Sequence, residues 1–199
     1  MIYLISALLL LPVLFFLNKR YIKNITNKTN YISVVSIYTL SSILTFYSNY
    51  IDVFQNISVF VLYMLMFLLT FIDLKKMEIP DELNIILFFY ASIYILSYYE
   101  IEVFLFGMQL LGIFTALWFI SEALFKKEMF GLGDLLYISI LAYLTNDTLS
   151  IVYMFLISSL IAIPISFVSI KLFKKNEIPY LPFLTIAFVI ETLFGISKI

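Results

Sequence analysis

Long runs of apolar residues, broken by short polar clusters, make up most of the chain. A helix needs about 20 apolar residues to span the hydrocarbon core of a membrane. Cutting the chain at its charged and turn-forming clusters leaves about eight such segments. They cover approximately residues 1–17, 31–48, 54–73, 83–99, 103–125, 134–146, 149–170 and 180–195. The pattern predicts an all-α polytopic membrane protein with about eight transmembrane helices, forming a single transmembrane domain over residues 1–199.

Two of these segments are unusual. The segment 134–146 is short for a span, so we expect it to be tilted or shielded by neighbouring helices. Pro164 lies inside the segment 149–170 and is expected to kink it, because proline removes a helix hydrogen bond.

The basic residues predict the orientation. Lys19, Arg20 and Lys23 follow the first apolar segment, the reverse of a secretory signal, so we expect the N-terminus outside. Alternating spans then place four loops in the cytoplasm, at residues 18–30, 74–82, 126–133 and 171–179. All of the 12 basic residues except Lys198 lie in these loops. The positive-inside rule therefore predicts both termini outside.

Composition agrees with a lipid environment and narrows the chemistry. Apolar residues make up 63% of the chain and charged residues 13%, which is too few to cover a soluble domain. A net charge of -1 gives no indication of a nucleic-acid partner. With no cysteine and no histidine, disulfides, Cys/His zinc sites and histidine-activated nucleophiles are excluded. An enzyme here would have to use carboxylates, lysines, tyrosines or hydroxyls.

Four acidic residues interrupt or adjoin apolar segments, where charge is costly: Asp73, Glu122, Asp134 and Glu191. Glu122 lies one helical turn before Lys126, and we expect it to pair with that lysine. Glu191 is expected to face a polar interior. Neither glutamate is assigned a catalytic role.

Asp73 and Asp134 are placed at the cytoplasmic ends of their helices. Asp73 closes the third segment, and Asp134 follows two glycines at the start of the sixth. Two carboxylates at one depth can share a proton, the arrangement by which aspartyl proteases activate water. As a hypothesis, the helix N-terminus favours Asp134 as the anion, and the helix C-terminus favours Asp73 as the acid.

The motifs around these aspartates resemble those of the type IV prepilin peptidases, a family of GxGD intramembrane aspartyl proteases. They are Ile72-Asp73 followed by Ile79-Pro80-Asp81 and Leu83; Lys127-Glu128 followed by Gly131-Leu132-Gly133-Asp134; and Ile178-Pro179-Tyr180-Leu181-Pro182-Phe183-Leu184. The resemblance implies that Asp73 and Asp134 are the catalytic pair, acting without metal or cofactor. It further implies removal of a basic leader from prepilin-like or pseudopilin-like precursors, with the active site at the cytoplasmic face of the inner membrane.

The chain departs from the family pattern in two places. Many members carry a cytoplasmic insert with paired, zinc-binding cysteines, associated with methylation of the new N-terminus. This chain has a short loop and no cysteine, so it resembles compact members that only cleave, and methyltransferase activity is in doubt. Leu181 stands where members often have glycine between two prolines.

The resemblance also suggests residues that position the substrate. Gly131 and Gly133 would let the substrate backbone come close, and Pro80, Pro179 and Pro182 would shape helix entries or position the substrate. Acidic residues at the same face are expected to attract the basic leader: Glu78, Asp81, Glu82 and Glu128.

Two other functions remain open. A small transporter or channel-like protein would use intramembrane carboxylates to carry ions or protons. A presenilin-like protease would cut ordinary transmembrane helices with a similar aspartate pair. The patterns predict neither the particular precursor nor the oligomeric state.

Overall fold

The computed structural model describes residues 12, 14–22, 27–47, 52–126, 131–145, 147–173 and 178–194, and the regular elements in these ranges are α-helices. After a first helical stretch over residues 14–21 come α2 (Asn27–Tyr47), α3 (Val53–Lys76), α4 (Asp81–Tyr98), α5 (Ile101–Phe125), α6 (Leu132–Thr145), α7 (Thr148–Phe173) and α8 (Leu181–Phe194). The all-α prediction is confirmed.

The described helices lie where the apolar pattern predicts them, whereas residues 1–11 and 13 of the first predicted segment lie outside the described residues. The largest difference is around the predicted loop 18–30. The first helical stretch continues beyond Asn18, and α2 already begins at Asn27. The reason is a buried polar contact: the side-chain amide of Asn18 donates hydrogen bonds of 2.6 Å to Asn30 Oδ1 and to Ser33 Oγ. These bonds pair the Asn18 amide nitrogen with two buried oxygens, which would otherwise favour a solvated loop.

Two predictions concern the later helices. The sixth helix is short as expected, with 14 residues in α6. Pro164 lies inside α7, which is one helix from Thr148 to Phe173, and the predicted kink stays a prediction.

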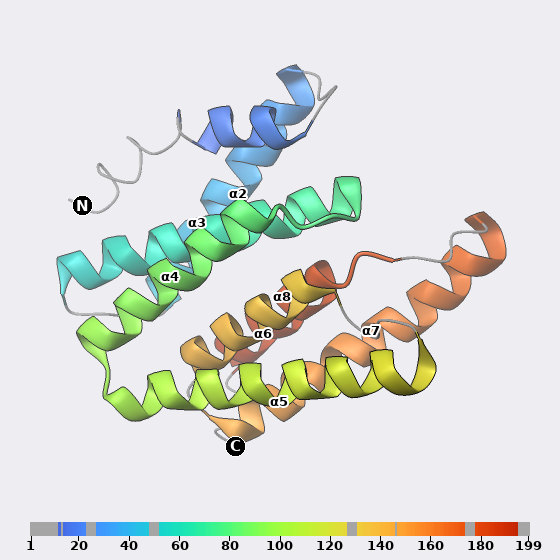
Figure 1. Ribbon diagram of the computed structural model, residues 1–199. Helices are drawn as coiled ribbons and strands as arrows, with labels where there is room; N and C mark the ends of the chain where they lie inside the picture. The colour runs from blue at the N-terminus through green and yellow to red at the C-terminus, as the bar shows by residue number, and fades with distance from the viewer. Residues whose placement is uncertain are drawn as a thin grey trace.

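Helix α3 is the central helix of the bundle. It packs against α2, α4 and α8, and most of its apolar span is buried. In contrast, α5 and α7 are mostly exposed, and each packs chiefly against one shorter helix, α5 on α6 and α7 on α8. Figure 1 shows α5 along one side of the bundle, with α6 and α8 between it and α3.

The exposed surface is apolar, as expected for helices in lipid. Among the described residues, α3, α5 and α7 are long and apolar enough to cross a membrane, and α6 and α8 are shorter apolar helices. Large apolar side chains such as Phe89, Leu160 and Phe167 lie on the outside of the bundle. A soluble monomer rarely exposes apolar surface on this scale. These features indicate a polytopic membrane protein.

Candidate active site

Asp73 lies in the last turn of α3 and is buried, with 5% of its surface exposed. The helix ends just beyond it because Met77 adopts a left-handed conformation, with φ of 57°, and donates its backbone N–H to the carbonyl of Asp73 at 2.8 Å. This is a common helix C-cap. The carboxylate is therefore held at the end of the central helix, away from the solvated lysines of the same turn.

The third sequence motif contacts Asp73 through its backbone. The N–H of Leu181, the first residue of α8, donates a hydrogen bond of 3.2 Å to Asp73 Oδ2. The first N–H groups of a helix have no partner within the helix, and they bind anions well. The start of α8 is therefore suited to hold the carboxylate of Asp73.

Asp134 lies in the first turn of α6, two residues beyond the helix start, and it caps that helix. Its Oδ2 atom accepts a bond of 3.3 Å from the N–H of Gly131, and its own N–H donates to the carbonyl of Gly131 at 3.0 Å. This reciprocal pair resembles a capping box, in which the third helical residue reaches back to the capping residue. The cap fixes the direction of the Asp134 carboxylate.

The two aspartates lie close enough for the charge of Asp134 to act on Asp73. The structure thus brings together the two residues that the sequence predicts as a pair. The hypothesis that helix ends separate an acid from an anion stays a prediction. Asp134 lies at the N-terminus of α6, and Asp73, although at the C-terminus of α3, accepts a bond from the N-terminus of α8. Each carboxylate therefore accepts one backbone N–H at the start of a helix.

The two glycines of the second motif have different surroundings. A side chain on Gly133 would place its Cβ 2.9 Å from Cδ1 and 3.0 Å from Cβ of Ile79. A side chain on Gly131 would meet only Asp134 Oδ2, at an ordinary contact distance of 3.5 Å. Gly133 therefore allows the segment before α4 to pack directly on the start of α6.

Asn84 in α4 also holds the second motif, a role that was not predicted from the sequence. Its side chain is buried, and Nδ2 donates a bond of 2.8 Å to the carbonyl of Gly133. The available signal was a lone amide in an apolar helix, one turn after the Pro80-Asp81 start. The role of the Leu181 N–H was also missed, because a backbone donor leaves no mark in residue identity.

The predicted prolines lie at helix entries. Pro80 is the N-cap residue of α4, and Pro182 lies buried in the first turn of α8. Pro179 precedes α8 and is half-buried. Proline suits the first turn of a helix, because it has no N–H to leave without a partner.

The acidic residues predicted to attract a basic leader are partly outside the described ranges. Glu78, Asp81 and Glu82 are exposed, and Glu128 lies outside the described residues.

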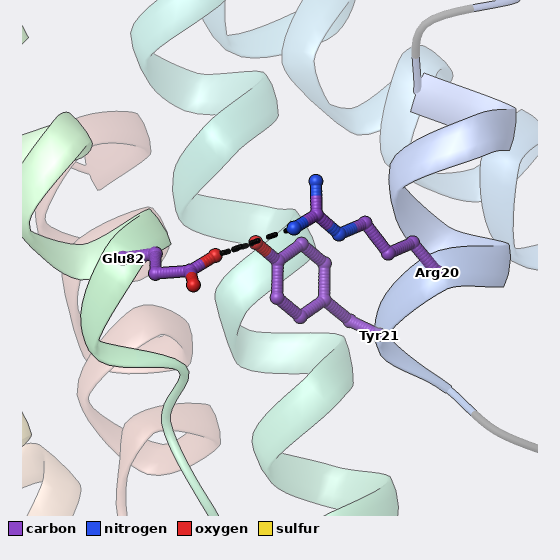
Figure 2. Close-up of polar contacts among 3 residues, drawn as sticks. All are labelled: Arg20, Tyr21 and Glu82. Carbon is purple, nitrogen blue, oxygen red and sulfur yellow. Dashed lines mark hydrogen bonds and ion pairs between the residues drawn. The ribbon is translucent and has the colours of Figure 1, made fainter.

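Glu82 already has partners on the first helical stretch. Tyr21 donates a hydrogen bond of 2.8 Å to Glu82 Oε2, and Arg20 Nη2 lies 3.7 Å from the same oxygen. Figure 2 shows both side chains reaching Glu82 from the first helix. Burial and the bond to Glu82 raise the pKa of the Tyr21 hydroxyl above its ordinary value.

Two apolar pockets adjoin the helix that carries Asp73. One, of about 240 Å³, lies between α2 and α3, and the other, of about 280 Å³, lies between α3 and α8. They share Leu40, Phe67, Thr70 and Leu74 in their linings. Together they form an apolar groove, called here the α3 groove, beside the last turns of α3.

The two remaining acidic residues lie apart from this site. Glu191 is buried and accepts a bond of 3.1 Å from Ser150 Oγ, which confirms the expected polar interior. The expected pair of Glu122 and Lys126 is wrong. Lys126 is the C-cap of α5 with φ of 52°, so it leaves the helical path, and only its backbone N–H bonds to the carbonyl of Glu122.

Comparison with known proteins agrees with the motif resemblance. The family model of the type IV leader peptidase family matches residues 60–167, which include α4, α5, α6 and most of α3 and α7. Comparisons with curated proteins and with solved structures find no match. The matched region is more than half of the 199 residues and contains both aspartates. The chain therefore belongs to the type IV leader peptidase family.

Proposed function

We propose that this protein is a membrane-embedded aspartic endopeptidase that removes the basic leader from prepilin-like or pseudopilin-like precursors. Asp73 and Asp134 are its catalytic pair. The observation that carries this proposal is the convergence of the three motifs on one carboxylate. Asp73 accepts a bond from the Leu181 N–H and feels the charge of Asp134. A purely structural interfacial aspartate would not need a second carboxylate beside it.

The proposed reaction needs one proton on the pair. The ionised carboxylate takes a proton from a water molecule, and the water oxygen forms a bond to the scissile carbonyl carbon. The protonated carboxyl gives its proton to the carbonyl oxygen, producing a tetrahedral diol. When the C–N bond breaks, the leaving nitrogen takes the proton from one carboxyl, and one hydroxyl of the diol returns its proton to the other carboxylate as the carbonyl re-forms. The pair therefore again holds one proton. Macroscopic titration then belongs to the pair and not to one residue.

The orientation follows from the basic loops. The chain forms one domain of about eight transmembrane helices, with both termini outside. In this topology the end of α3 and the starts of α6 and α8, which carry the site, lie at the cytoplasmic face. The leader of a precursor is on that side before cleavage. Exposed Glu78, Asp81 and Glu82 at the start of α4 supply negative charge for its basic residues.

The apolar segment that follows the leader packs in the α3 groove. This groove is apolar and lies on the outer surface of the bundle. Its lining includes Thr70 and Leu74, which lie on either side of Asp73 along α3. Because the α3 groove is open to lipid, a membrane-inserted helix can approach it from the bilayer. The scissile bond at the boundary between leader and apolar segment then lies at the level of the aspartates.

The proposal is tested with the purified chain in lipid vesicles and three reporters. The first has a basic leader before an apolar segment, the second has the leader lysines and arginines replaced by glutamine, and the third is an ordinary transmembrane helix without a leader. Mass spectrometry reads the new N-terminus of each product. We expect cleavage at the leader junction of the first reporter, slower cleavage of the second and none of the third, with no methyl group added.

The rival functions predict other results. Cleavage of the third reporter within its apolar segment, with the first left intact, would indicate a presenilin-like protease. Proton or ion flux that requires Asp134, without cleavage of any reporter, would indicate a transporter. Either result would overturn the proposal.

A further inference from the structure

Three buried hydroxyls from three different helices contact one another in the centre of the bundle. Thr70 in α3 lies 2.6 Å from Thr185 in α8, measured between the two Oγ1 atoms. The hydroxyl of Tyr137 in α6 lies 2.7 Å from Thr185 Oγ1 and 3.3 Å from Thr70 Oγ1. All three side chains are buried. Every pair is within hydrogen-bond distance, so the hydroxyls form a closed triangle.

Each hydroxyl belongs to a helix that carries one part of the candidate active site. Thr70 lies one turn before Asp73, Tyr137 one turn after Asp134, and Thr185 one turn after Leu181. Residues one turn apart lie on the same face of a helix. The triangle therefore lies directly below the two aspartates and the Leu181 N–H, and the hydroxyl of Tyr137 feels the charge of Asp73.

The number of protons makes the three hydroxyls depend on one another. Each hydroxyl has one proton to donate and lone pairs to accept. Thr70 and Thr185 could each donate instead to a carbonyl of their own helix, at 2.9 Å in both cases. Those carbonyls already accept the regular N–H bonds of their helices, so they do not need the hydroxyl protons. A circular arrangement, in which each hydroxyl donates to the next, then gives every hydroxyl one donor and one acceptor partner. Removing any one hydroxyl opens the circle.

We propose that Thr70, Tyr137 and Thr185 form a hydroxyl ring that positions Asp73, Asp134 and the Leu181 N–H relative to one another. They are positioning residues, because they act through the helices that carry the reacting groups. The inference rests on the proposed leader cleavage for its activity assay. The physical basis is that α3, α6 and α8 present mainly apolar surfaces to one another. Apolar contacts are not directional, so they do not by themselves fix how each helix is rotated about its own axis. A directional ring of hydrogen bonds fixes both the rotation and the height of the three helices.

The variants Tyr137→Phe and Thr185→Val remove one hydroxyl each with little change of shape. We expect kcat for the leader reporter to fall about tenfold or more, because small misplacements of reacting groups have large effects on rate. In Tyr137→Phe, KM should stay within about twofold, because Tyr137 is not among the residues that line the α3 groove. Loss of kcat alone marks a loss of transition-state geometry. Thr185→Ser retains the hydroxyl and should recover most of kcat.

Two control variants remove hydroxyls outside the ring. Tyr143→Phe alters an equally buried tyrosine of α6, and Thr45→Val alters a buried threonine of α2 that bonds to its own helix. Both should keep the native kcat. Native kcat in Tyr137→Phe would overturn the proposal. An equal loss in Tyr143→Phe would do so too, as would a Thr185→Ser protein as slow as Thr185→Val.

A second measurement does not depend on activity. Hydrogen exchange of the Leu181 amide, read from fragment ions by mass spectrometry, should speed up in Tyr137→Phe and Thr185→Val and stay native in Tyr143→Phe. If the native chain cleaves no leader, the proposed function fails, and exchange at Leu181 still decides the ring. Unchanged exchange in both ring variants would contradict it.

Discussion

The backbone N–H of Leu181 donates a 3.2 Å hydrogen bond to Asp73 Oδ2 across 108 positions of sequence. This bond joins the first and third motifs and explains how a leucine can serve at position 181. Any residue except proline supplies the N–H, and the leucine side chain is fully buried. The bond also shows why the start of α8 must lie beside the end of α3 for the site to form.

The two glycines of the second motif should respond differently to alanine. Gly133→Ala forces Cβ against Ile79, so we expect cleavage of the leader reporter to fall about tenfold or more as the start of α6 shifts. Gly131→Ala meets only ordinary contact and should keep a larger share of activity. Initial rates of the two variants at equal protein concentration make the comparison.

Shortening the neighbour provides the control for this effect. Ile79→Ala removes Cδ1 and Cγ2, two of the three atoms nearest to the added Cβ. The double variant should therefore recover part of the activity lost in Gly133→Ala. A Gly131→Ala protein slower than Gly133→Ala would contradict the contact as the cause.

Asn84→Leu should reduce cleavage more than stability. It removes the bond to the Gly133 carbonyl, which anchors the second motif to α4. The variant also removes a buried Oδ1 that has no hydrogen-bond partner within the described residues, which offsets part of the loss. We expect the free energy of unfolding in detergent to change by no more than about 1 kcal/mol, with a clear loss of kcat. Ser97→Ala, at an exposed position of α4, is the control and should change neither quantity.

The contact in Figure 2 allows a test of leader recognition. If Glu82 binds basic residues of the leader, Glu82→Gln should raise KM for the basic reporter and leave KM for the glutamine reporter unchanged. The effect should weaken at high salt, because both partners are exposed. Arg20→Gln frees Glu82 from its own cation, so KM should stay the same or fall. A higher KM in Arg20→Gln would argue against this role of Glu82.

The sequence predicts much of this fold because lipid imposes a simple pattern. Apolar runs mark the helices, and the start of α4 at Asp81 follows from Pro80, whose fixed geometry suits a helix entry. The pairing of Asp73 with Asp134 was predicted from topology and motif resemblance. The extension of helix through Asn18 was missed, because buried amide pairs depend on which helices meet.

The details of the site depend on contacts between distant segments. The N–H of Leu181 and the amide of Asn84 act on atoms far away in sequence, and neither residue type suggests that role by itself. The acid and base roles of the two aspartates also depend on such contacts. A helix C-terminus was expected to favour a protonated Asp73, but a second helix supplies its N-terminus to the same carboxylate.

Filling the α3 groove should hinder binding of the apolar segment. Ile186 is exposed and lines the groove, so Ile186→Trp should raise KM several-fold for a reporter with the full apolar segment. The Ile186→Trp protein should cleave a soluble leader peptide that lacks this segment as efficiently as the native chain does. Val152→Trp, at an exposed position of α7, controls for a new tryptophan in lipid. Equal KM values for the two tryptophan variants would exclude the groove as the binding site.

The central claim is that Asp73 and Asp134 act together as the catalytic pair. The most direct test is leader removal in vesicles by the native chain, Asp73→Asn, Asp134→Asn and the control Asp52→Asn. Asp52 caps the opposite end of α3, and asparagine caps a helix as well as aspartate does, so this control should cleave normally. We expect no product from either Asp73→Asn or Asp134→Asn, with both proteins folded as judged by thermal unfolding. Native cleavage by either variant would contradict the two-aspartate mechanism.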